Sequence, residues 1–150
     1  MAPLLVAACG SEAVQLLADD EAAIYGDVAA RLCAQARCGP SHPAFVLLEV
    51  DTPQARTGVA AQLPDAVFIA TTDGLVGPDD QVIEGGRIIY LGQIRPVPDR
   101  PGEPIVLIDT FWESSPFEGK GETYVYEWNG EAWLNVDPST VGITVSTAVP

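Results

Sequence analysis

One acidic residue lies in a stretch that is otherwise typical of a protein interior. Asp109 falls within the nearly continuous apolar run Ile105–Trp112, which predicts a central strand covered on both faces. A carboxylate in an apolar cavity has a raised pKa and can act as a general base. Alternatively, Asp109 lies on a wet face of the strand, or pairs with Arg87 or Arg95, and is structural.

The other polar residues do not form a known catalytic or metal-binding set. His42 is the only histidine, and its position between Ser41 and Pro43 is typical of an exposed turn. No nucleophile-elbow pattern accompanies it, so a Ser–His–Asp triad is incomplete. The chain has three cysteines and one histidine, with no second cysteine cluster, so it lacks the ligands for a four-ligand zinc site. We therefore expect neither a metal nor a cofactor.

Aromatic residues gather near the C-terminus. Two β-rich segments flank Asn129-Gly130, a pair typical of a two-residue type I′ turn. Such a turn places Tyr126 opposite Trp133. The aromatic residues predicted to share one face are Tyr124, Tyr126, Trp128 and Trp133. We expect this face to bind a small apolar ligand or a protein partner. Alternatively, Tyr126 and Trp133 form a cross-strand pair beneath a helix.

Apolar periodicity predicts the elements that position these residues. An amphipathic helix begins near residue 19, where Asp19 or Asp20 can cap it, and the Gly- and Pro-containing segment 39–43 ends it. Residues 63–70 fit either a short helix or a strand. Strands are predicted at 45–50, 87–95, 105–112, 124–128, 131–135 and 141–147. Loops are predicted at 51–62, 72–86 and 114–121.

A helix packed on four to six mostly antiparallel strands makes a single α+β domain over residues 19–150. This order, with its Asn-Gly…Trp hairpin, resembles the cystatin-like or nuclear-transport-factor-2-like fold over residues 19–147. The resemblance implies a curved sheet wrapping the helix around a pocket, which some members use for catalysis and many only for binding or assembly. Enzymes that resemble this fold often place an Asp–His or Asp–Tyr arrangement in the pocket, but no motif of the superfamily falls on residues of this chain. An isomerase- or hydratase-like enzyme would use Asp109 with Tyr90 or Tyr126. Fold alone does not choose among these functions.

The cysteines bear on the cellular compartment. The chain contains Cys9, Cys33 and Cys38, and an odd cysteine in a secreted protein needs an explanation. Cys33 and Cys38 can form a disulfide where a helix ends and the chain turns, but not within a continuous helix. The alternative is two free thiols in a reducing cytosol.

The segment Val6-Ala7-Ala8-Cys9, followed by Gly10 and Ser11, resembles the end of a bacterial lipoprotein signal. The resemblance implies lipidation of Cys9, with residues 1–18 forming a truncated signal and tether. It also implies an extracytoplasmic protein anchored to a membrane through lipid. If Met1 is the native start, residues 1–18 are instead the N-terminal segment of a cytoplasmic protein.

Charge and hydropathy argue against nucleic-acid binding and against a membrane-spanning segment. The net charge of −14 repels phosphate backbones, so we expect no nucleic-acid binding. No apolar run approaches the roughly 18 residues of a membrane span, which leaves a lipid anchor as the only membrane attachment. The first hypothesis is therefore a non-catalytic extracytoplasmic lipoprotein domain that binds through its aromatic face, with a homodimer left open. The alternatives are the small pocket enzyme and a cytosolic interaction protein.

Overall fold

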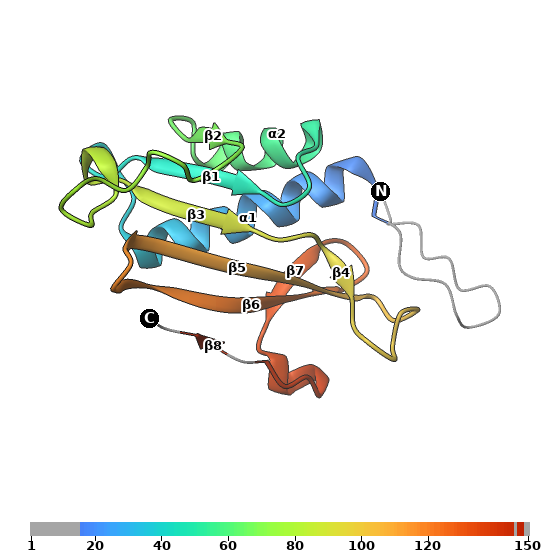
Figure 1. Cartoon of the computed structure of the whole chain (residues 1–150). Helices are drawn as coiled ribbons and strands as arrows, with labels where there is room; N and C mark the ends of the chain where they lie inside the picture. The colour runs from blue at the N-terminus through green and yellow to red at the C-terminus, as the bar shows by residue number, and fades with distance from the viewer. Residues whose placement is uncertain (1–15, 146, 149–150) are drawn as a thin grey trace.

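The computed structural model describes residues 16–145 and 147–148, and Figure 1 shows their arrangement. The helices are α1 (Ala18–Ala36) and α2 (Pro53–Gln62), with short 3-10 turns at Ile83–Gly85 and Pro138–Val141. The strands are β1 (Ala44–Leu48), β2 (Val67–Ile69), β3 (Arg87–Leu91), β4 (Arg95–Pro96), β5 (Ile105–Ser115), β6 (Glu118–Trp128), β7 (Trp133–Val136) and β8 (Thr147–Ala148).

All eight of these strands belong to one mixed sheet. The main order is β2-β1-β3-β5-β6-β7, with β4 beside β5 and β8 beside β6. Strand β1 runs parallel to β2 and β3, and the other pairs are antiparallel. The α+β class is therefore confirmed, although the sheet has more strands than the four to six predicted. Helix α1 crosses one face of the sheet, with α2 beside it (Figure 1).

Helix α1 packs against the sheet through the apolar stripe that the sequence predicts. Ile24, Val28 and Leu32 are at most 1% exposed, and burying each such side chain contributes about 1.5–3 kcal/mol. The helix begins one residue early, after Leu17, which makes no side-chain cap, so the predicted Asp19 or Asp20 cap is wrong. Arg37 ends the helix in the left-handed conformation. Within the described residues, no helix is long and apolar enough to cross a membrane.

The segment after β1 corrects the sequence analysis, because most of the predicted loop at 51–62 is helix α2. Thr52 begins it: the Ala55 N–H donates to the Thr52 hydroxyl at 3.1 Å, and Pro53 occupies the first turn. The buried side of α2 is made of Ala55, Gly58 and Val59. These small residues give a weak apolar signal, and yet they let α2 lie close to α1. The following strand β2 bears out the strand alternative for part of 63–70.

Two predicted boundaries between strands and loops are also wrong. The predicted strand 87–95 is interrupted after Leu91, where the Gly92 N–H donates to the Asp109 carbonyl oxygen. The predicted loop at 114–121 is reduced to Pro116-Phe117, because β5 and β6 pair along nearly their full lengths. Pairing across the hairpin outweighs the local glycine-rich, polar composition. Among the described residues of the predicted strand 141–147, only Thr147 is in a strand, in β8.

The β6–β7 hairpin has a different register from the predicted one. Trp128 pairs with Trp133, and Tyr126 pairs with Asn135 rather than with Trp133. The loop therefore contains four residues, 129–132. Within it, the Asn129 side-chain oxygen accepts hydrogen bonds from the Glu131 and Ala132 N–H groups. The register differs by two residues, and a shift of two keeps every side chain on its predicted face.

The face of the sheet opposite the helices, here called the outer face, is only partly covered. At one end the 72–86 loop packs Leu75 and Val82 on Phe45 and Ile88. At the other end, residues 142–145, here called the C-terminal strap, contribute Ile143 and Val145 to a cluster around three side chains of the sheet. These are Ile105, Leu107 and Val125. Between these clusters Asp109 is exposed, while Tyr90 and Phe111 are half-buried.

Candidate functional site

A pocket of about 690 Å³, here called the outer pocket, lies between the outer face and the C-terminal strap. Leu107, Asp109 and Thr123 of β5 and β6 contribute to its lining. Arg95, Val97 and Arg100 line it from β4 and the loop that follows. Ile143, Thr144 and Val145 line it from the strap. This volume falls within the range typical of small-molecule sites.

Asp109 is fixed in this pocket by two partners. Arg95 Nη2 donates to both carboxylate oxygens, at 3.0 and 3.2 Å, and Thr123 Oγ1 donates to one of them at 2.5 Å. Burial raises the pKa of Asp109, but the hydrogen bonds from Thr123 and Arg95, with the Arg95 charge, outweigh it and lower the pKa overall. The raised pKa expected for an apolar cavity is therefore wrong, and the Arg95 pair left open by the sequence is present.

The two tyrosines considered as partners of Asp109 lie on opposite faces of the sheet. Tyr90 pairs with Phe111, two residues from Asp109 along β5, and so shares the outer face. Burial and the neighbouring Glu49 carboxylate raise the pKa of Tyr90. Tyr126 packs in the core cluster on the helix side. Because Asp109 is half exposed and its pKa is lowered, it is a poor general base near neutral pH.

The aromatic face predicted for binding lies beneath α1. Tyr124, Tyr126 and Trp133 are at most 8% exposed and belong to the main core cluster. Tyr124 Oη accepts a 2.7 Å hydrogen bond from Gln35 on α1. Trp128 stands at the rim with its ring 5.9 Å from that of Trp133. The four aromatic residues share a face as predicted, and three of them fill the core beneath the helix.

The cysteine pair lies where α1 ends. Cys33 and Cys38 form a disulfide with Cα atoms 4.9 Å apart. The left-handed conformation of Arg37 turns the chain back, and the Cys38 N–H donates to the Cys33 carbonyl oxygen at 3.0 Å. The two cysteines therefore lie at disulfide distance where the helix ends, as the sequence predicts. Cys9, predicted to be lipidated, lies outside the described residues, as does the rest of the lipoprotein-like segment.

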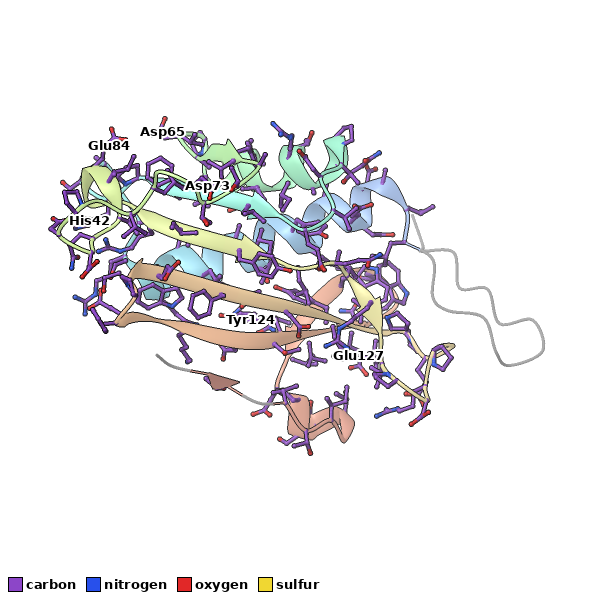
Figure 2. The ribbon with its side chains drawn as sticks, viewed as in Figure 1. His42, Asp65, Asp73, Glu84, Tyr124 and Glu127 are labelled. Atoms are coloured by element: carbon purple, nitrogen blue, oxygen red, sulfur yellow. A yellow bond between two sulfur atoms is a disulfide. The ribbon has the colours of Figure 1, made fainter. Side chains whose placement is uncertain are left out.

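His42 belongs to a turn beside the 72–86 loop, as Figure 2 shows. Its Nδ1 lies 2.8 Å from the Gly85 carbonyl oxygen, so the ring links this turn to the 3-10 turn at Ile83–Gly85. In the part of the chain that the structure describes, no three His, Cys, Asp or Glu side chains come together as a metal site. The contact with Gly85 indicates a structural role for His42.

Sequence reasoning missed most of the outer pocket. The sequence pairs Arg95 only with Asp109, gives no site role to Arg100 or Thr123, and predicts only a strand where the strap lies. Strand alternation held a usable signal, because Leu107 and Asp109 must share one face of β5. The strap held none, since its place beside β6 depends on the long-range packing of Ile143 and Val145.

Comparisons with known proteins add no functional information. No protein-family model matches the chain, and no curated protein matches it. A solved structure with weak similarity is the sugar N-methyltransferase KedS8 from Streptoalloteichus sp ATCC 53650. It shares 8% identity and a TM-score of 0.28, and the match covers 87% of this chain and 73% of that one. A likeness this weak carries no argument about fold or function.

Proposed function

We propose that this chain is a non-catalytic binding domain that takes a small ligand in the outer pocket. The observation that carries the proposal is the combination of apolar and charged surface in a space of about 690 Å³. Ile143 and Val145 offer apolar contacts, while Asp109 and Arg95 hold each other in a defined geometry. Ligand sites typically combine an apolar lining with a few placed polar groups.

We further propose that the domain works outside the cytoplasm, anchored through lipid on Cys9. Two observations support this location: the lipoprotein-like segment that ends at Cys9, and the Cys33–Cys38 disulfide, a bond typical of oxidising compartments. Metabolic labelling with a fatty-acid analogue tests the anchor. Label on the wild-type gene product that is absent from Cys9→Ala supports the location, and an unlabelled wild-type protein overturns it.

The outer pocket is a better binding site than the aromatic face because α1 already occupies that face. The resemblance to the cystatin-like or nuclear-transport-factor-2-like fold is proposed only as a fold relationship. The packing of α1 across the antiparallel strands β3, β5, β6 and β7 supports it. The parallel pairs that β1 makes with β2 and β3 depart from the expected order, and no function is taken from the resemblance.

Native mass spectrometry after exposure to a host-cell extract tests the binding function. Wild-type protein should retain a small molecule. Thr144→Trp should lose it, because Thr144 lines the outer pocket and is exposed, so a larger side chain can fill space there. Thr57→Trp is the matched control, since Thr57 is an exposed residue of α2 away from the pocket. No retained molecule, or equal retention by Thr144→Trp, would overturn the proposal.

A further inference from the structure

The outer pocket holds opposite charges side by side, although the chain as a whole is strongly acidic. Arg95 and Arg100 both line it, out of only seven basic residues in a chain with net charge −14. Arg95 is matched by Asp109, and Arg100 pairs with Glu103 at 2.6 Å. Glu122 also lines the pocket, but its carboxylate accepts a hydrogen bond from Gln35 of α1 and lies 3.8 Å from Lys120. The site is therefore close to electrically neutral, with a positive and a negative group both present.

The Arg95–Asp109 pair retains capacity for further hydrogen bonds. Only Nη2 of Arg95 donates to Asp109, although a guanidinium has five N–H donors. Asp109 accepts from Arg95 and Thr123, while a carboxylate offers about four acceptor positions. The Arg95 and Asp109 side chains are 39% and 53% exposed. A ligand can therefore reach both charged groups without separating them.

An apolar surface lies directly beside this charged pair. Val97 and Leu107 line the outer pocket but are only 6% and 4% exposed, so its accessible apolar lining comes mainly from the half-buried Ile143 and Val145. Ile143 and Val145 of the strap pack against the same cluster. An apolar group of a ligand held by Arg95 and Asp109 would contact this surface and lose its exposure to water.

Building on the proposed function, we propose that the outer pocket binds a small zwitterion with an apolar side chain: an α-amino acid such as leucine, or a dipeptide of such residues. The ligand ammonium group donates to Asp109, its carboxylate accepts from Arg95, and its side chain packs on Ile143 and Val145. The pocket volume of about 690 Å³ leaves space for more than one residue.

The charges of the pocket argue against ligands with only one sign of charge. A purely anionic ligand is repelled by the net charge of −14 and meets Asp109 beside Arg95. A purely cationic ligand bound to Asp109 lies beside the positive charge of Arg95, and the repulsion between these like charges disfavours its binding. A zwitterion satisfies both groups at once.

Isothermal titration calorimetry of the complete chain tests this assignment with four matched probes. L-leucine and L-leucyl-L-leucine are zwitterions, leucinamide lacks the carboxylate, and 4-methylpentanoate lacks the ammonium group. We expect at least one zwitterion to bind, and leucinamide and 4-methylpentanoate each to bind at least tenfold more weakly than it does. Charge-assisted hydrogen bonds support a loss of that size. Equal affinity for either truncated probe, or no binding of either zwitterion, would overturn the inference.

Variants then test whether binding uses this ion pair. Arg95→Gln and Asp109→Asn should each weaken zwitterion binding at least tenfold. The matched controls are Arg56→Gln and Asp51→Asn, because Arg56 and Asp51 form a similarly exposed pair away from the pocket. Unchanged binding by Arg95→Gln or Asp109→Asn overturns the inference.

The retained host molecule separates this inference from the proposed function. If Thr144→Trp releases a molecule that is not a zwitterion, the ligand class is wrong and the pocket remains a binding site. If wild-type protein retains nothing, the proposed function fails as well.

Discussion

The hydroxyl of Tyr126 donates a 2.7 Å hydrogen bond to the carboxylate of Asp27, across 99 residues of sequence. It joins β6 to the middle of α1. The same Asp27 oxygen accepts a bond from Arg31 Nε at 2.7 Å. Burial raises the pKa of Tyr126, and the hydrogen bond to Asp27 raises it further. The hydroxyl therefore stays protonated and remains a donor. This bond helps to hold α1 over the aromatic face that the sequence left available for a ligand.

Tyr126→Phe should therefore lower the free energy of unfolding by about 1–2 kcal/mol. The lost bond is made to a charged acceptor, and Asp27 keeps its bond to Arg31. Urea unfolding followed by circular dichroism measures the change. Tyr90→Phe on the outer face is the comparison: its hydroxyl also faces a carboxylate, that of Glu49, but Tyr90 is less buried than Tyr126, so a smaller loss is expected. Equal losses in the two variants would contradict a specific role for the Tyr126–Asp27 bond.

The Cys33–Cys38 disulfide should stabilise the fold modestly, because it closes a short loop. For a sequence separation of five, the chain-entropy relation gives roughly 2 kcal/mol. The double variant Cys33→Ala/Cys38→Ala should unfold at correspondingly lower urea concentration. Adding dithiothreitol should destabilise the wild type and leave the double variant unchanged. In protein from the native host, quantification with a thiol reagent under denaturing conditions should find neither Cys33 nor Cys38 free. Two free thiols at these positions would contradict the bond.

The sequence predicts those elements whose own side chains are large and apolar. Ile24, Val28 and Leu32 predict α1 because their spacing alone defines a buried stripe. Helix α2 was missed because its contact surface consists of Ala55, Gly58 and Val59, which carry little hydrophobic signal. The hairpin register was missed because it depends on two hydrogen bonds accepted by the Asn129 side chain, a detail that turn statistics do not specify.

The site was harder to predict than the fold. Apolar residues occupy both faces of β5 from Ile105 to Ile108, so composition does not distinguish the helix face from the outer face. The placement of Asp109 on the outer face is fixed only when α1 covers Ile108, because the next residue along the strand then points to the opposite face. The outer pocket further requires the strap, whose position follows from packing between residues far apart in sequence.

The close contact of the two helices depends on Gly58. A Cβ atom added there would overlap the backbone of Ala22 in α1, and one added to Gly26 would lie 2.7 Å from the Gly58 carbonyl oxygen. Backbone cannot move aside as a flexible side chain can. Gly58→Ala should therefore destabilise the fold by about 1–3 kcal/mol, despite the better helix propensity of alanine.

Thermal and urea unfolding of Gly58→Ala and Gly39→Ala provide a matched comparison. Gly39 has no atom within 4 Å of an added Cβ and does not need a positive φ, so its substitution should be nearly neutral or slightly stabilising. If Gly58→Ala is as stable as Gly39→Ala, α1 and α2 do not pack as closely as described.

The titration of Asp109 distinguishes an ionised binding group from a general base. Its folded-state pKa lies below the ordinary value of 3.8. Its contribution to stability is therefore fully present above that ordinary value and is lost as the pH falls through the lower folded-state pKa. Because the Arg95 and Asp109 side chains are exposed, the contribution at pH 7 should stay below about 1 kcal/mol. The stability difference between wild type and Asp109→Asn should disappear in acid.

Carboxyl carbon NMR measures this pKa directly. Arg95→Gln should move the Asp109 titration to higher pH, because it removes a hydrogen bond and a positive charge that favour the carboxylate. The Asp51 carboxyl, whose pKa is lowered by Arg56, should not move in that variant and serves as the internal control. An Asp109 that titrates above 3.8 in the wild type would contradict the ion pair. One that titrates near neutrality would make general-base catalysis the better account of the outer pocket, since an ionised, hydrogen-bonded carboxylate is suited to holding a ligand ammonium group rather than to removing a proton.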